Sequence, residues 1–187
     1  EDIYAGLSHV SNDIIYGVIK TSSNIIMNEK EHYFHYGIFE FSSEDADRIT
    51  DYINQNIEED GYCIWTIVFD RIQKSMPIFI ENNVYLSSIG IRNAVAKKLS
   101  GRFHFDGEVI CRRDESLSMA DVYRLYGEHH TPFSDDDLYY FSKEVSNGVI
   151  YFDSLSETAV RVNKNLFISK GNIDFDIEAT DNAIATY

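Results

Sequence analysis

The 187-residue chain has little proline, little cysteine and few positive charges, and it contains no long apolar run. With only Pro77 and Pro132, the sequence favours regular elements joined by short connections. No stretch approaches the roughly 18 consecutive apolar residues that a membrane helix needs, so we expect no membrane span. The first residues show no signal-peptide pattern, and we expect a cytoplasmic protein.

Cysteine use excludes a disulfide framework. Cys63 and Cys111 are the only cysteines, and they form neither a CxxC motif nor a zinc-finger spacing. One disulfide between them stays open as an alternative. Buried, reduced thiols in a cytosolic protein are the simpler interpretation.

The shortage of positive charge limits the partners. Lys and Arg number 16 against 31 Asp and Glu, which gives a net charge of −15. Such a surface repels phosphates and argues against non-specific nucleic-acid binding by the whole molecule. It fits a dispersed protein, a protein with a basic partner, or a mimic of nucleic-acid charge. The 44% of hydrophobic residues is enough to build a core.

Recognisable catalytic motifs are also missing: no GxSxG, Walker A, GxGxxG or HExxH occurs. Asp174, Asp176 and Glu178 alternate in "NIDFDIE" and would share one face of a strand. They leave a metal-dependent nuclease as a weaker alternative to a solvated acidic face. His32 and His35 would point to opposite faces of a strand, which counts against joint metal ligation. We expect no catalytic residue, metal or cofactor.

The first 41 residues are predicted to hold a helix and an edge strand. Apolar residues over 10–28 follow a helical spacing, which "TSSN" interrupts. The aromatic segment "YFHYGIFEF", residues 33–41, is typical of a strand. We expect this strand to pair with a hairpin further along the chain.

Residues 42–113 predict helix, helix, helix and β-hairpin. Ser42 is a helix cap, and the second helix, over residues 63–74, is expected to stop at Pro77. A third helix should run from Ser87 or Ser88 to about Leu99. "DG" at Asp106-Gly107 is a strong hairpin signal. This order is the winged-helix arrangement.

Residues 114–187 predict a second module of the same kind, truncated at its C-terminus. Helices are expected over 118–130 and 134–145, started by Ser118 and Ser134 with acids in their first turns. "VIYFDSLSETAVRVNKNLFIS" then predicts a hairpin that turns near 153–157, with no separate third helix before it.

The segment "LSMADVYRLYGEHHTPFSDDDLYYFSKEV", residues 117–145, resembles the opening of a small bacterial winged-helix module. It is similar to the HARE-type helix-turn-helix family, to which the delta subunit of bacterial RNA polymerase belongs. The resemblance rests on helix caps and spacing over about 30 residues and includes no invariant chemical motif. It implies a role in transcription or DNA transactions through binding, without catalysis.

The stretch "IRNAVAKKLSGRFHFDGEVICRR", residues 91–113, holds six of the sixteen basic residues and only two acids. In a winged helix these residues would lie on the third helix and the wing, which contact DNA. The alternative is structural: lysines offset the helix dipole, and arginines pair with the abundant acids. The candidate contact residues are Arg92, Asn93, Lys97, Lys98, Arg102, Arg112 and Arg113.

Together these patterns predict an α+β fold with a part at 1–41 and two winged-helix-like modules at 42–113 and 114–187. The predicted function is that of a non-catalytic binding module of a larger bacterial or phage protein. Its partner would be nucleic acid or a protein, bound through the basic helix and wing. An acidic protein-interaction or nucleic-acid-mimic protein is the alternative.

Overall fold

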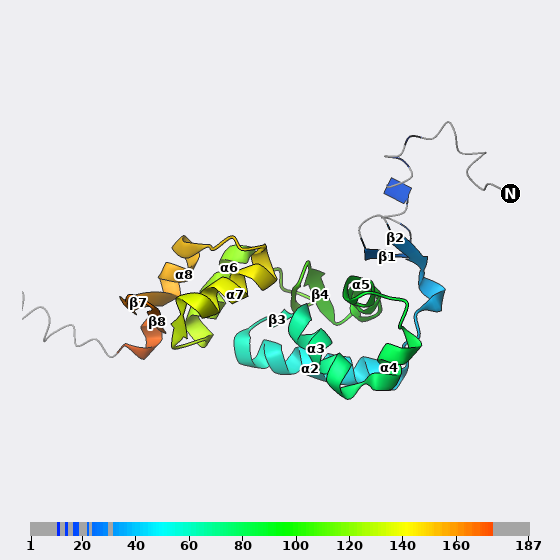
Figure 1. Cartoon of the computed structure of the whole chain (residues 1–187), viewed down its shortest axis with the longest axis horizontal. Coiled ribbons are helices and arrows are strands. Elements are labelled where there is room, and N and C mark those ends of the chain that lie inside the picture. Colours follow the sequence, from blue (N-terminus) through cyan, green and yellow to red (C-terminus); the bar gives the residue numbers. More distant parts are fainter. Residues whose placement is uncertain are drawn as a thin grey trace, which may run out of the picture.

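The computed structural model describes residues 24–29 and 32–173, with the isolated positions 11, 14, 17, 18 and 22. The chain has an α+β fold, with two helix-plus-hairpin modules lying side by side (Figure 1). The elements of the first part are β1 (Ile25–Glu29), β2 (His32–His35), η2 (Tyr36–Ile38), α2 (Ser43–Asp60), β3 (Cys63–Ile64), α3 (Trp65–Ser75), α4 (Pro77–Asn82), α5 (Ser88–Leu99), β4 (Phe103–Asp106) and β5 (Val109–Arg112). Those of the second are α6 (Met119–His129), β6 (Phe133–Ser134), α7 (Asp135–Ser146), α8 (Phe152–Thr158), β7 (Ala159–Asn163), β8 (Leu166–Ser169) and η3 (Lys170–Asn172).

The two modules share one topology. Each begins with a helix, a two-residue strand and a second helix, and each ends with a helix followed by a hairpin. In each three-stranded antiparallel sheet the short strand pairs with the last strand of the hairpin, giving the orders β3-β5-β4 and β6-β8-β7. The first module differs by the additional short helix α4. The predicted α+β class, with two helix-plus-hairpin modules, is confirmed.

Three of the helices begin with the same device. In each, the serine hydroxyl accepts a hydrogen bond from the backbone N–H of the aspartate three positions on. The carboxylate of that aspartate accepts a hydrogen bond from the serine backbone N–H. The aspartate also lies where a negative charge offsets the helix dipole. These caps were predicted from sequence at the observed serines. The pairs are Ser42–Asp45, Ser118–Asp121 and Ser134–Asp137.

The start of the second predicted helix differs from the prediction, whereas its end, at Ser75, agrees with it. Cys63 and Ile64 form β3, and α3 starts at Trp65, because these two residues pair with Ile110 and Val109 of β5. A partner about 45 residues away therefore overrides the local helical spacing. The helix ends before Pro77 as predicted, and Pro77 then opens the unpredicted short helix α4, where its missing N–H would be unpaired in any case.

The N-terminal prediction was right in part: the described positions Ile14, Gly17 and Val18 are helical, and residues 33–35 lie in a strand, but the end of the predicted helix is wrong. Ile25 and Ile26, expected in a helix, lie in β1 and pair with His35 and Phe34 of β2. β-Branched residues opposite aromatic ones favour a strand pair. The aromatic segment forms a strand only as far as His35, and this hairpin is a separate two-stranded sheet. The edge position that we assigned to the segment is taken by β3.

The second module has the third helix that the sequence prediction lacked. The hairpin turn was predicted near residues 153–157, but residues 152–158 form α8, and the hairpin follows as β7 and β8. Leu155 is 2% exposed and faces α6 at Gly127. A Cβ on Gly127 would lie 2.7 Å from Thr158 Oγ1 and 3.0 Å from Leu155 Cδ1. The glycine allows the two helices to approach, and this tertiary contact holds α8.

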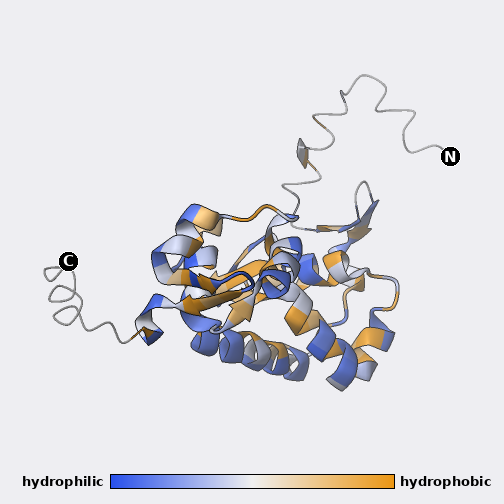
Figure 2. Ribbon diagram, turned by 60° about the vertical axis from the view of Figure 1, so that its left-hand side comes forward, coloured by the Kyte–Doolittle hydropathy of each residue, from blue (hydrophilic) through white to orange (hydrophobic). Residues whose placement is uncertain are grey.

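The β3-β5-β4 sheet separates two hydrophobic cores. Cys63 and its partner Ile110 belong to the core of the first module. Ile64 and its partner Val109 belong to the core of the second. Successive strand residues point to opposite faces, so one sheet supplies a wall to both cores. Figure 2 shows the hydrophobic segments enclosed between more hydrophilic helices.

Tyr62 extends the same alternation. It packs into the second core, whereas Trp65, three residues on, packs into the first. The first core also takes in Ile26 of β1 and Phe39, which follows η2. The N-terminal hairpin, the first module and the second module are thus joined by buried apolar contacts. They pack as one unit rather than as beads on a flexible linker.

We predict that Ile64→Ala destabilises the protein by about 2–5 kcal/mol, because Ile64 is 4% exposed and fills the second core from the first module. Ile78→Ala is the matched control: Ile78 is 72% exposed, and its loss should change stability by less than about 0.5 kcal/mol. Urea denaturation followed by tryptophan fluorescence measures both variants. An Ile64→Ala protein as stable as Ile78→Ala would contradict the shared wall.

We also predict that Gly127→Ala lowers stability by roughly 1–2 kcal/mol, although alanine is the better helix former. The new methyl group would displace Thr158, which donates a 2.7 Å hydrogen bond to the Arg124 carbonyl. At Gly101, by contrast, a Cβ would meet nothing within 4 Å. Thermal unfolding of Gly127→Ala and Gly101→Ala tests this, and a stabilised Gly127→Ala protein would show that the two helices do not approach closely.

Candidate nucleic-acid interface

The N-terminal hairpin covers part of α5, the helix that was predicted to contact DNA. Ser87 caps α5 and donates its backbone N–H to Asn28 Oδ1 at 2.7 Å. Gly90 passes so close that a Cβ there would lie 2.1 Å from the same oxygen. Asn93 Nδ2 donates to the Met27 carbonyl at 2.8 Å. Asn93, one of the predicted contact residues, is therefore bonded to β1.

The basic residues of α5 also have partners within the protein. The Arg92 guanidinium forms an ion pair with Glu108 in the β4–β5 turn, and its side chain is only 15% exposed. The ammonium groups of Lys97 and Lys98 lie 4.9 and 5.7 Å from the centroid of the Tyr36 ring. These are cation–π distances. Of the residues predicted on this helix, Arg92 and Asn93 are engaged internally, and the two lysines border the hairpin.

The remaining three predicted residues come together at the base of the β4–β5 hairpin. Arg102, Arg112 and Arg113 are exposed and line a depression of about 500 Å³ beside α2. Strand pairing places Arg112 opposite Phe103, next to Arg102. Arg113 Nη1 donates to the Gly101 carbonyl at 3.5 Å. We call these three residues the arginine group.

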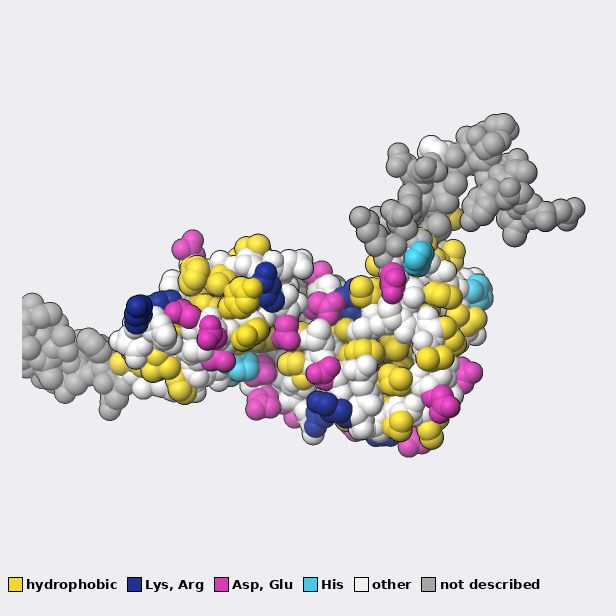
Figure 3. Space-filling model, in the orientation of Figure 1, with side chains coloured by type: hydrophobic (Ala, Val, Ile, Leu, Met, Phe, Trp, Pro, Cys, Tyr) yellow, Lys and Arg dark blue, Asp and Glu magenta, His cyan; other side chains and the backbone are white. Residues whose placement is uncertain are grey.

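Acidic and polar side chains border the arginine group. Arg102 Nη1 lies 3.0 Å from Thr50 Oγ1 and 3.7 Å from Asp47 Oδ1. Glu58 of α2 and Asp114 also line the depression. Exposed ion pairs of this kind contribute little to stability, typically 0–1 kcal/mol. A stronger anion such as a phosphate can therefore replace them. The patch is positive but small. On another face of the molecule, Figure 3 shows scattered acids and few basic residues.

A second feature, which the sequence analysis missed, is a pocket of about 270 Å³ between the modules. Tyr62, Tyr126 and Phe141 form its aromatic wall, with Tyr126 stacked on Phe141 at a centroid distance of 3.9 Å. Asp60 Oδ1 lies 3.4 Å from His130 Nε2 at its edge. Burial raises the pKa of Asp60, and the charge of His130 opposes that rise. The residues that line the pocket come from segments far apart in the sequence. The only sequence feature that pointed to them was the abundance of aromatic residues.

The structure supports neither a metal site nor a reactive cysteine among the described residues. Within the part of the chain that the structure describes, no three His, Cys, Asp or Glu residues are grouped as metal ligands. Asp174, Asp176 and Glu178 lie outside the described residues. Cys63 and Cys111 are both buried free thiols, as expected, and burial raises the pKa of Cys63 to about 12. Both cysteines are thus packing residues rather than thiolate nucleophiles.

None of the described helices is long and apolar enough to cross a membrane. Comparisons with protein families, curated proteins and solved structures found no match for the chain. The residues and their geometry alone therefore carry the functional argument.

We predict that Arg92, which is ion-paired with Glu108, contributes to stability, whereas the exposed Arg112 does not. Arg92→Met should cost roughly 1–3 kcal/mol, because Glu108, at 27% side-chain exposure, loses its partner. Arg112→Met should stay within about 0.5 kcal/mol of the parent. Urea denaturation of the two variants checks this difference, and equal losses would contradict it.

Proposed function

We propose that this chain is a non-catalytic binding module that contacts the phosphate backbone of nucleic acid through Arg102, Arg112 and Arg113. The observation that carries the proposal is the gathering of these exposed arginines around one depression. Arginine suits phosphate because its planar guanidinium donates two parallel hydrogen bonds. The rest of the acidic surface limits binding to this place.

The topology supports the same proposal. Both modules have the helix order and terminal hairpin of a winged helix, in which the hairpin touches the nucleic-acid backbone. The arginine group lies at the base of that hairpin in the first module. Because the N-terminal hairpin covers part of α5, the proposed contact uses the β4–β5 hairpin and not a helix inserted into a groove. Backbone contact of this kind positions a partner without reading sequence.

Fluorescence anisotropy with labelled duplex DNA, single-stranded DNA and RNA tests the proposal. Binding should weaken with salt, and three phosphate contacts predict a slope of roughly −2 to −3 in log K against log salt. Arg112→Glu should weaken binding at least about tenfold, since it replaces an attraction by a repulsion. Affinity should depend on the phosphate charge of the nucleic acid and not on its base sequence.

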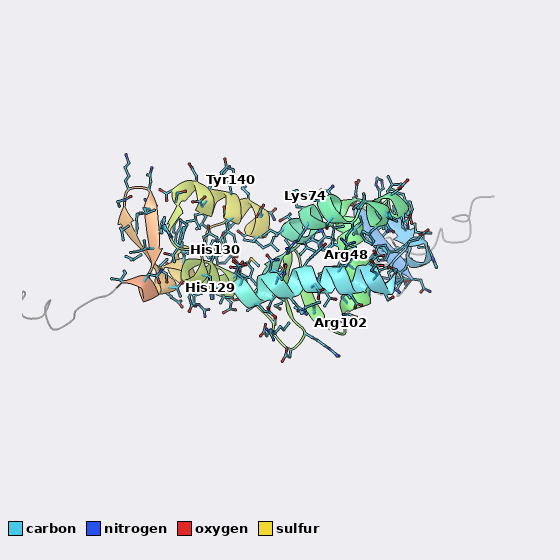
Figure 4. The ribbon with its side chains drawn as sticks, turned by 90° about the horizontal axis from the view of Figure 1, so that it is seen from below. Arg48, Lys74, Arg102, His129, His130 and Tyr140 are labelled. Atoms are coloured by element: carbon cyan, nitrogen blue, oxygen red, sulfur yellow. The ribbon has the colours of Figure 1, made fainter. Side chains whose placement is uncertain are left out.

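Lys74→Glu is the control, because it changes the net charge by the same amount. Lys74 lies on α3, on the opposite side of α2 from Arg102 (Figure 4). It should leave nucleic-acid affinity within about twofold of the parent. The absence of binding at low salt, or equal losses in the two variants, would contradict the proposal.

A further inference from the structure

The side of α2 opposite the arginine group carries a groove of the opposite charge. A depression of about 810 Å³ runs between α2 and α3, and Glu58, Glu59 and Asp70 are in its walls. It adjoins the inter-module pocket, since Asn56 and Ile67 line both. Tyr140 of α7 and Lys74 of α3 lie along this side of α2 (Figure 4). We call the depression and the pocket together the acidic groove.

Carboxylates of both modules meet in the acidic groove. Asp60, Asp137 and Glu144 line the pocket end, so α2 and α7 both contribute. Partial burial and the nearby charges of Asp70 and Glu108 raise the pKa of Glu144. Like charges brought together in this way repel, and a cation would relieve the repulsion. Of the basic residues in the walls, Arg71 is bonded to Gln55 Oε1 at 2.6 Å and Lys74 is exposed, while His130 lies 3.4 Å from Asp60.

Tyr62, which lines the pocket, carries a buried polar atom that the described residues do not satisfy. Tyr62 lines the pocket and is 2% exposed, and its hydroxyl has no hydrogen-bond partner within the described part of the chain. An unpaired buried hydroxyl costs free energy and is uncommon in native proteins. The aromatic rings beside it suit a cationic group, whose charge is attracted by ring faces.

We propose that the acidic groove binds a basic segment of a protein partner, with one Lys or Arg side chain entering the pocket beside Tyr62. Charge complementarity selects this occupant over an apolar or anionic one. The pocket accepts the cationic side chain between Tyr126, Phe141 and the carboxylates, and Tyr62 Oη accepts a hydrogen bond from it. The groove along α2 and α3 takes the residues that flank it. This inference does not depend on nucleic-acid binding by the arginine group.

Anisotropy with a fluorescein-labelled peptide of alternating arginine and serine tests the proposal on the full chain. The same peptide with glutamine in place of arginine should not bind. Glu144→Gln and Asp70→Asn should each weaken binding about threefold to fivefold. Asp51→Asn is the control, since Asp51 is exposed on α2 outside the groove walls. Lys74→Glu should strengthen binding.

Tyr62→Phe separates a binding role from a structural one. Removal of an unpaired hydroxyl should leave the melting temperature of the free protein unchanged or raised, while peptide affinity falls at least about threefold. Arg112→Glu should not weaken peptide binding. Unchanged affinity in Tyr62→Phe, or equal losses in Glu144→Gln and Asp51→Asn, would overturn the proposal. Because the nucleic-acid test uses other residues, either proposal can fail alone.

Discussion

The architecture depends on one small sheet that is buried on both faces. Cys63 and Ile110 point into the first core, and Ile64 and Val109 point into the second. A strand buried on both sides cannot move relative to either core without exposing apolar surface, at about 25 cal/mol per Å². The two modules are therefore held in one orientation. Any site between them, including the pocket around Tyr62, has fixed walls, and such walls reduce the entropy cost of binding.

The charged side chains divide between the two sides of α2. Helix α2 contributes an isoleucine face to the first core, and its exposed flanks border two different depressions. One flank faces the arginines at the hairpin base, and the other faces the carboxylates of the acidic groove. Helix α5, with β1 packed against it, contributes structure more than surface. A strongly acidic protein in this way carries an arginine-lined depression and a carboxylate-lined groove on one rigid body.

Sequence reasoning succeeded where the determinants were local. Serine caps and the Asp106-Gly107 turn are short-range features, and the structure has them as predicted. It failed where distant partners decided the outcome: β3 exists because β5 pairs with it, and α8 because Gly127 lets it approach α6. The arginine group was predicted as part of a longer basic list. No local pattern revealed that Arg92 and Asn93 would turn inward.

The central claim is that the two modules form one cooperative unit through the shared sheet, and differential scanning calorimetry tests it most directly. The account predicts a single transition whose calorimetric enthalpy equals its van't Hoff enthalpy. Two transitions, or a van't Hoff enthalpy near half the calorimetric one, would mean that the modules unfold independently. The pocket between them would then lack the fixed walls that the binding arguments require.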